Sequence, residues 1–182
     1  IRALHFDAAG TLWIGSDGGL TRRDDSGFTS FTTADGLPLP AVSSVTSDRH
    51  GDLWLASCES LYTPGDPITC QPVRRTDTRF QSWADLGAQY IFALTADAEG
   101  NLWAGISAGV ARYDVGDFAT WTTADGLAHN TVRAVHEDGD GVLWFGTLGG
   151  LSRFDGRAFR TWTIADGLPH DTVHDILSDD HG

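Results

Sequence analysis

Two histidines stand at matching positions in the chain, and each precedes another polar side chain. His129 is followed by Asn130 after a Gly-Leu-Ala segment, and His170 is followed by Asp171 after Gly-Leu-Pro. Imidazole, amide and carboxylate groups together donate and accept hydrogen bonds, so these pairs are suited to binding a polar ligand. We therefore treat the four residues as candidate ligand-binding residues. A structural role within a turn is the competing interpretation.

Two adjacent arginines form a second candidate binding group. Arg74 and Arg75 carry permanent positive charges that are suited to an anionic ligand or partner, although a solvated charge pair is the plainer explanation. The segment from Asp138 to Gly141 resembles part of a calcium loop but lacks the remaining oxygen ligands. The sequence therefore predicts no metal site.

Patterns that would indicate catalysis are weak. His5 and His136 fall at matching positions on predicted strands, where a structural histidine is the expected interpretation. No order of serine, histidine and aspartate supports a nucleophilic triad. We therefore predict no catalytic residue and no cofactor.

These candidates belong to a unit that recurs along the whole chain. Its best-preserved element is Gly-x-Leu-Trp, found at Gly10–Trp13, Gly51–Trp54, Gly100–Trp103 and Gly141–Trp144. The copies span residues 1–41, 42–90, 91–131 and 132–172, and residues 173–182 begin a fifth. Four short apolar runs per copy, separated by turn residues at this period, are typical of a propeller blade.

The sequence therefore predicts an all-β β-propeller segment forming part of a ring. We expect four blades of four antiparallel strands, followed by one extra innermost strand at residues 173–182. The repeated tryptophans are expected to be buried between blades, because the residue two positions later is always small. Those small residues are Gly15, Ala56, Gly105 and Gly146.

Two irregularities accompany this pattern. The aromatic residues of each fourth strand are three apart, as in Phe28 and Phe31, which predicts a bulge or a change of face. The second copy carries extra residues that we assign to the connection between its third and fourth strands. Cys58 and Cys70 are candidates for a disulfide across this insertion in an oxidising compartment, and a free pair of thiols is the alternative.

Composition limits the functional classes. The net charge of −13 and the pI near 4.6 argue against general nucleic-acid binding, which needs a basic surface. Aspartates at repeated turn positions, including Asp7, Asp97, Asp138 and Asp179, explain much of this charge. No apolar run reaches the roughly 18 residues of a membrane span. Because the chain has no Met, we expect it to be a segment of a longer protein whose blades, or further copies, complete the ring.

The segment from Asp138 to Pro169 resembles the two-component regulator propeller repeat. It reads Asp-x-x-Gly-x-Leu-Trp-x-Gly-Thr, then Gly-Gly-Leu-Ser-Arg-Phe-Asp, Phe-x-Thr-Trp and Asp-Gly-Leu-Pro. The resemblance implies a non-catalytic, extracytoplasmic sensor of a signalling protein, with a small molecule or an oligosaccharide as ligand. A propeller enzyme similar to the streptogramin lyases and a purely structural scaffold are the alternatives.

Overall fold

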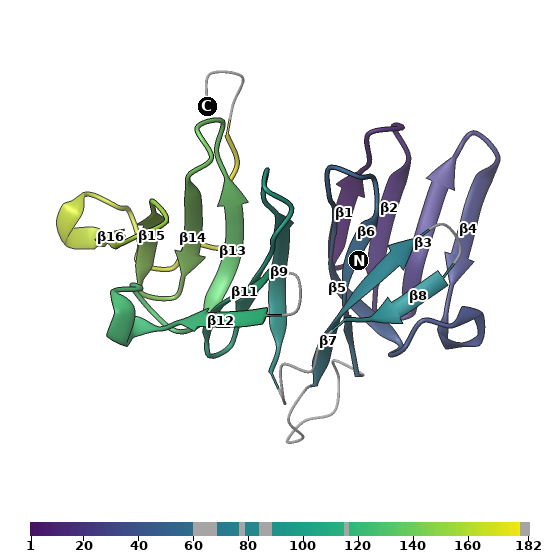
Figure 1. Cartoon of the computed structure of the whole chain (residues 1–182), viewed down its shortest axis with the longest axis horizontal. Coiled ribbons are helices and arrows are strands. Elements are labelled where there is room, and N and C mark those ends of the chain that lie inside the picture. Colours follow the sequence, from purple (N-terminus) through teal and green to yellow (C-terminus); the bar gives the residue numbers. More distant parts are fainter. Residues whose placement is uncertain (60–68, 77–78, 84–88, 115–116, 179–182) are drawn as a thin grey trace. The chain divides into compact units, whose positions relative to one another are not determined.

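The computed structural model describes residues 1–59, 69–76, 79–83, 89–114 and 117–178. Within these ranges the chain is all-β, with four four-stranded sheets and three short 3-10 helices (Figure 1). The predicted fold class is therefore confirmed. No helix in the described part of the chain combines the length and the hydropathy that a membrane span needs.

Each sheet is one blade, and we number the blades in chain order. Blade 1 contains β1 (Ala3–Phe6), β2 (Leu12–Ser16), β3 (Gly19–Asp24) and β4 (Gly27–Phe31). Blade 2 contains β5 (Ala41–Ser47), β6 (Leu53–Cys58), β7 (Cys70–Thr76) and β8 (Arg79–Ser82). Blade 3 contains β9 (Ile91–Ala96), β10 (Leu102–Ile106), β11 (Gly109–Asp114) and β12 (Asp117–Trp121). Blade 4 contains β13 (Val132–Glu137), β14 (Leu143–Thr147), β15 (Gly150–Phe154) and β16 (Phe159–Trp162).

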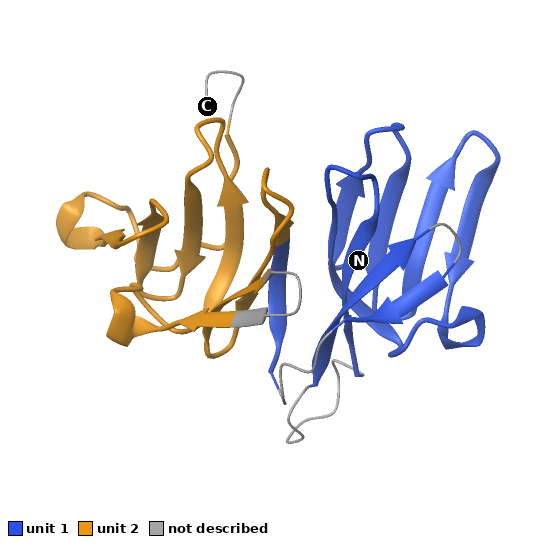
Figure 2. Cartoon of the chain, viewed as in Figure 1, with its two compact units in different colours: residues 1–94 blue, residues 95–182 orange. Residues whose placement is uncertain are grey.

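The strands within each sheet follow one another in space as they do in sequence. The chain divides into two compact units, residues 1–94 and residues 95–182 (Figure 2). Blades 1 and 2 lie in the first unit, blade 4 lies in the second, and β9 of blade 3 contains the division between them.

A hydrogen bond from an indole to an aspartate closes the first hairpin of every blade. In blade 3, Trp103 Nε1 donates to Asp97 Oδ2 at 2.8 Å, and the other carboxylate oxygen accepts from the backbone N–H of Asn101 at 2.7 Å. Trp13, Trp54 and Trp144 donate in the same way to Asp7, Asp48 and Asp138. The aspartate therefore accepts hydrogen bonds from both the turn backbone and the indole N–H. The tryptophan can thus be buried without losing a hydrogen bond.

These hydrogen bonds favour the charged forms of Asp7 and Asp138. Burial opposes ionisation of Asp7, but the hydrogen bonds from Trp13 and from the N–H groups of Thr11 and Ala9 outweigh it and lower the pKa of Asp7. The hydrogen bond from the Trp144 indole is the largest cause of the lowered pKa of Asp138, with burial opposing it. The carboxylate is thus part of the folded structure, as well as a solubilising charge.

In blades 1 and 3, the glycine two positions after the tryptophan packs against the first strand of the next blade. A Cβ atom on Gly105 would lie 2.9 Å from Val132 Cγ1 and 3.1 Å from Val135 Cγ2. A Cβ atom on Gly15 would lie 2.8 Å from the carbonyl oxygen of Val42. The backbones of β2 and β10 therefore approach the first strand of the following blade too closely for a larger side chain.

β-Bulges occur in first strands, at positions that the sequence did not indicate. The register shifts between Val42 and Ser44 in β5, and between Val132 and Ala134 in β13. One extra residue brings positions three apart onto the same face, which is why Val132 and Val135 are both buried. The fourth strands β4 and β16 pair with their third strands without a register shift, so their aromatic residues three apart lie on opposite faces of the sheet.

The connections that follow blades 1, 3 and 4 are 3-10 turns closed by a capping box. In the first of them, η1 (Thr33–Asp35), the Asp35 carboxylate accepts from the N–H and the hydroxyl of Thr32. Gly36 follows in the left-handed conformation at φ 93°, and Leu37 is buried in the core. The same construction recurs at η2 (Thr123–Asp125) and η3 (Ile164–Asp166). Turn chemistry therefore accounts for these aspartates, whereas Asp179 lies outside the described residues.

Two assignments within the second and fifth copies are corrected. The insertion lies between β6 and β7, the second and third strands of blade 2, because Cys70–Thr76 is itself the third strand. In the last segment, the described residues 173–178 carry no strand, and residues 179–182 lie outside the description. A strand needs a hydrogen-bonded neighbour, and the segment is anchored instead by the Val173 N–H donating to Thr147 O at 2.9 Å.

We expect the Asp138→Asn substitution to lower the free energy of unfolding by about 1.5–3 kcal/mol at pH 7, because a hydrogen bond to a charged group is lost. The wild-type protein should lose stability below about pH 4, since the unfolded aspartate takes up a proton at a higher pH than the folded one. The variant should show a weaker loss over that range. Urea denaturation as a function of pH measures both effects.

Asp140→Asn is the matched control, because Asp140 is an exposed residue of the same turn and its substitution removes the same charge. It should leave both the stability and its pH dependence close to those of the wild type. Identical pH profiles for the wild type and the Asp138 variant would contradict a structural role for this carboxylate.

We also expect Gly105→Ala to destabilise the protein by about 1–3 kcal/mol, because the new methyl group overpacks the junction with β13. Gly139→Ala is the control, since a Cβ atom there meets nothing within 4 Å. Thermal unfolding followed by circular dichroism compares the two variants. Equal melting temperatures would show that the junction is looser than the structure describes.

Candidate ligand pocket

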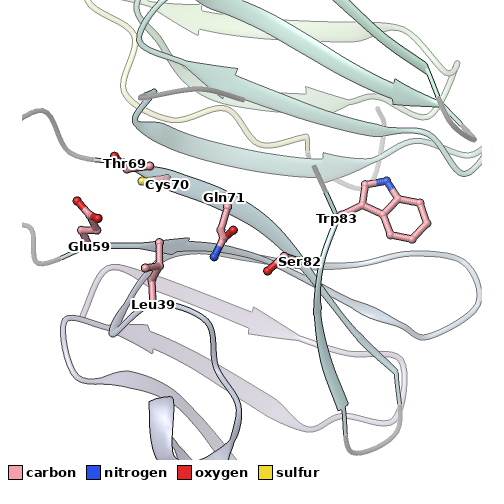
Figure 3. Close-up of a pocket in the computed structure, with 7 residues that line it drawn as sticks. All are labelled: Leu39, Glu59, Thr69, Cys70, Gln71, Ser82 and Trp83. Atoms are coloured by element: carbon pink, nitrogen blue, oxygen red, sulfur yellow. The ribbon is translucent and has the colours of Figure 1, made fainter. Parts of the chain in front are cut away.

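A pocket of about 480 Å³ lies on the first unit, at the edge where β6 ends and β7 begins. Its lining comes from the blade 1 to blade 2 connection, from the β6–β7 hairpin and from the end of β8 (Figure 3). The lining residues are Leu39, Glu59, Thr69, Cys70, Gln71, Ser82 and Trp83. Three separate segments therefore meet around one hollow.

A disulfide braces the hairpin that forms one wall. Cys58 and Cys70 are cross-strand partners at the facing ends of β6 and β7, and their sulfur atoms are 2.06 Å apart. The Glu59 N–H donates to Thr69 O at 3.0 Å just beyond the disulfide. Closing a loop of this length contributes on the order of 3 kcal/mol by restricting the unfolded chain. The disulfide therefore fixes the ends of β6 and β7, from which this wall of the pocket begins.

The pocket lining is mixed, with more apolar than polar surface, and most of its polar groups are uncharged. Gln71 and Ser82 offer amide and hydroxyl groups, Thr69 adds a hydroxyl, and Leu39 adds apolar surface. Glu59 is the one ionisable side chain among the described lining residues, since Cys70 is oxidised. Such a lining can donate and accept several hydrogen bonds without a strong charge preference.

Trp83 contributes to the pocket wall, but its indole points away from the other labelled side chains in Figure 3. The indole instead packs edge-on against Trp54, with ring centroids 5.2 Å apart, and lies 5.5 Å from the Arg74 guanidinium carbon. It is 37% exposed. The Trp83 indole therefore packs the end of β8 against β6 and β7 of the same blade.

The four candidate residues of the connections are engaged within their own turns. His129 Nδ1 accepts from the Thr131 N–H at 2.9 Å, and His170 Nδ1 accepts from the Thr172 N–H at the same distance. Asn130 and Asp171 each accept from the first N–H of the preceding 3-10 turn, at 2.8 and 2.7 Å. These contacts supply the structural interpretation of the pattern, and the binding role of the four residues stays a prediction.

Arg74 occupies a position that recurs in every blade. It pairs with Trp54 across β6 and β7, as Arg22, Arg112 and Arg153 pair with the tryptophans of their own blades. Its guanidinium lies 5.5 Å from the Trp54 ring and forms a salt bridge with Asp52. Arg74 therefore packs within its blade, and its role as a ligand contact stays a prediction.

Arg75 lies on the face of blade 2 that meets blade 1. Its guanidinium carbon is 5.1 Å from the Trp13 ring and 5.0 Å from the Phe31 ring. Cation–π contacts of this kind are worth about 0.5–2 kcal/mol, depending on how far the cation is desolvated. Arg75 thus joins two blades, and its predicted ligand role is likewise untested.

The inner-strand histidines also make contacts within the protein. His5 Nε2 lies 2.8 Å from Ser47 Oγ, and His136 Nε2 lies 2.9 Å from Ser178 Oγ. Burial lowers the pKa of His5, although the nearby Asp7 carboxylate opposes this. In the described residues, no group of three His, Cys, Asp or Glu side chains is placed to hold a metal ion.

A second, smaller hollow of about 200 Å³ lies on the other unit, beside the first turns of blades 3 and 4. It is acidic, with Asp97, Glu99 and Glu137 in its lining, and Glu137 Oε2 accepts from the Ala98 N–H at 2.8 Å. Burial is the main cause of the raised pKa of Glu137, and the neighbouring carboxylates add to it. Asp97 already accepts hydrogen bonds from the Trp103 indole and from its own turn. We therefore interpret this hollow mainly as part of the packing between blades 3 and 4.

Sequence reasoning missed the residues of the larger pocket. Glu59, Gln71 and Ser82 follow no repeated motif, so their types alone carried no signal. The signal that existed was the insertion flanked by Cys58 and Cys70, which marked this edge of blade 2 as unlike the others. Placing the insertion one hairpin too late separated it from the strand ends that form the pocket.

Comparison with known proteins agrees with this architecture. Residues 126–149 match a family described as two component regulator propeller. The extracellular domain of the hybrid two component system BT3049 from B. thetaiotaomicron is similar in structure, with a TM-score of 0.78 and 19% identity. That similarity covers 100% of this chain and 25% of the other. No curated protein matches the chain in sequence at a significant level.

Two structures of enzymes are also similar. A catalytically inactive variant of virginiamycin B lyase from Staphylococcus aureus, with quinupristin, has a TM-score of 0.73 and 17% identity, over 94% of this chain and 57% of the lyase. The gluconolactonase XC5397 from Xanthomonas campestris has a TM-score of 0.72 and 19% identity, over 98% of this chain and 65% of the enzyme. At such identities the similarity shows the fold alone.

The chain spans between a quarter and about two thirds of the length of these structures. Their common feature is the propeller blade, which is also the unit that repeats here. The match at residues 126–149 thus identifies a two component regulator propeller repeat within this chain of propeller blades.

Proposed function

We propose that the chain is a non-catalytic ligand-sensing part of an extracytoplasmic signalling protein. The observation that carries this proposal is the pocket at the β6–β7 edge, which combines apolar surface with several polar groups and is formed where blade 2 departs from the repeat. A hydroxyl-rich small molecule or an oligosaccharide suits a lining of amide, hydroxyl and single carboxylate groups. Pockets that combine some apolar surface with a few convergent polar groups are the usual form of a small-molecule site.

The disulfide and the family support the extracytoplasmic part of the proposal. A bond between Cys58 and Cys70 forms and persists in an oxidising compartment. The similar domain of BT3049 is extracellular. A pocket whose wall depends on a disulfide is suited to the same environment.

An enzymatic role, similar to that of the lyase and lactonase neighbours, is the second candidate. It is supported by the shared fold alone. The described pocket lining offers Glu59 as its single titratable group, whereas acid–base catalysis usually combines an acid and a base. The chemistry of the pocket therefore favours binding over turnover.

The proposal predicts that a panel of neutral oligosaccharides contains a ligand that raises the melting temperature. At about 100 times its Kd, such a ligand stabilises the folded protein by about 2.7 kcal/mol. For a chain of this size that corresponds to about 5–10 °C. Gln71→Ala should abolish most of the shift, because it removes an amide from the pocket. Thermal unfolding, followed by titration calorimetry on each hit, measures the effect.

Gln81→Ala is the matched control, since Gln81 is an exposed residue of β8 in the same blade and is not part of the pocket lining. It should leave the shift unchanged. A shift that survives Gln71→Ala would contradict binding at this pocket. Conversion of a hit, or of quinupristin, into product would favour the enzymatic role instead.

A further inference from the structure

The hairpin that carries the disulfide is closed differently from its equivalent in blade 4. In blade 4, Thr147 Oγ1 donates to Gly150 O at 2.7 Å and closes the turn between β14 and β15. Ser57 holds the equivalent position in blade 2, three residues after the tryptophan, but its hydroxyl donates to Leu39 O at 2.9 Å. The hydroxyl of blade 2 is thus engaged with the blade connection, and the disulfide joins the strand ends instead.

This difference in closure accompanies the pocket. In blade 4, a Cβ atom on Gly149 would lie 3.0 Å from His129 Cβ, so the β14–β15 turn packs directly on the preceding blade connection. Glu59 and Leu39 hold the positions of Gly149 and His129 in blade 2, and both line the pocket. The pocket therefore lies where blade 4 has a direct contact between hairpin and connection.

The two halves of the disulfide have different surroundings. Cys58 is 0% exposed, and its Sγ lies 3.3 Å from Ser43 Oγ. Ser43 is held on the core side, because its hydroxyl donates to the carbonyl oxygen of buried Ile91 at 2.8 Å. Cys70 is 1% exposed but belongs to the pocket lining (Figure 3). The pocket is therefore the side from which a reagent approaches the disulfide, and Cys70 is the half that it meets.

Reduction changes the space that the two cysteines need. Two thiol groups must lie at van der Waals separation, and Cys58 is already packed against Ser43 on the core side. Cys58 and Cys70 form the last pair in the register of β6 and β7, and strand ends open at a lower free energy than strand centres. We therefore expect the end of the reduced hairpin to shift toward the pocket.

We propose that the pocket is a redox-regulated site, in which a small dithiol reductant attacks the disulfide at Cys70. One thiolate of the reductant bonds to Cys70 Sγ as the S–S bond breaks, and Cys58 leaves as a thiolate. The second thiol of the reductant then displaces Cys70. The reductant is thereby oxidised to a cyclic disulfide, and its two electrons and two protons leave both cysteines as thiols.

Reduction opens the wall of the pocket, and a ligand in the pocket blocks the reductant. By linkage, a ligand makes the disulfide harder to reduce by the same factor by which reduction weakens its binding. This regulatory part rests on the proposed function, because it takes the sensed ligand to occupy this pocket. The route of the reductant does not depend on it.

The test follows the reduction of the folded protein by dithiothreitol, with the remaining disulfide measured by mass spectrometry after alkylation. Below the unfolding transition, the rate should be independent of urea, because an opening at the end of a hairpin exposes little surface. A rate that rises with urea in parallel with global unfolding would overturn the proposal.

Gln71→Trp places a large side chain in the pocket beside Cys70 and stands in for an occupant. It should slow reduction by about 10-fold or more, because access to the sulfur is blocked. Gln81→Trp is the matched control, since Gln81 is exposed on β8 outside the pocket lining, and it should react at the wild-type rate. Thr69→Trp fills the same pocket if Gln71→Trp does not fold. A filled pocket with an unchanged rate contradicts the proposed route.

Brief alkylation of the reduced protein with iodoacetamide identifies the thiol that faces the pocket. Cys70 should react about 10 times faster than Cys58, since reactivity follows exposure. Equal labelling, or loss of the folded circular-dichroism spectrum on reduction, would assign the disulfide to the stability of the whole blade instead. These measurements use no ligand, so a failed oligosaccharide screen leaves them unchanged. Reduction only through global unfolding would likewise leave the proposed binding function standing.

Discussion

The hydrogen bond from a buried indole to the aspartate six residues earlier is the interaction on which each blade depends. Tryptophan provides the largest apolar surface in the repeat, but its N–H must find an acceptor when it is removed from water. The aspartate that caps the β1–β2, β5–β6, β9–β10 or β13–β14 turn provides that acceptor with its second oxygen. One carboxylate thus couples the conformation of the turn to the burial of the core.

The close approach of blades follows from the same motif. The residue two positions after the tryptophan lies on the same face of the strand, and a glycine there leaves a gap that the next blade fills. Gly15 and Gly105 receive Val42 and Val132 in this way. The repeat is therefore a unit with one filled face and one face that needs a neighbour, as in other stacked repeat proteins.

The pocket arises where this regular construction is interrupted. Blade 2 keeps its Asp–Trp hydrogen bond and its arginine–tryptophan pair, so its sheet is conventional up to the end of β6. Beyond that point Cys58 and Cys70 are joined by a disulfide at the ends of β6 and β7, and Glu59 and Gln71 line the pocket beside it. The repeat thus provides the scaffold, and the candidate site lies where blade 2 departs from the repeat.

The sequence by itself determined the all-β class, the number of repeats and the burial of Trp13, Trp54 and Trp103, because these depend on local periodicity and on turn residues at fixed offsets. Only the tertiary structure decided where the bulges lie, which hairpin carries the insertion and which residues line the pocket. The spacing of Val132 and Val135 did not reveal a bulge, since its effect is seen only when both side chains meet Gly105. Likewise, Arg74 and Arg75 are neighbours in sequence, but strand alternation sends one to its own blade's tryptophans and the other to the rings of blade 1. Such roles depend on partners distant in the chain, which local patterns do not specify.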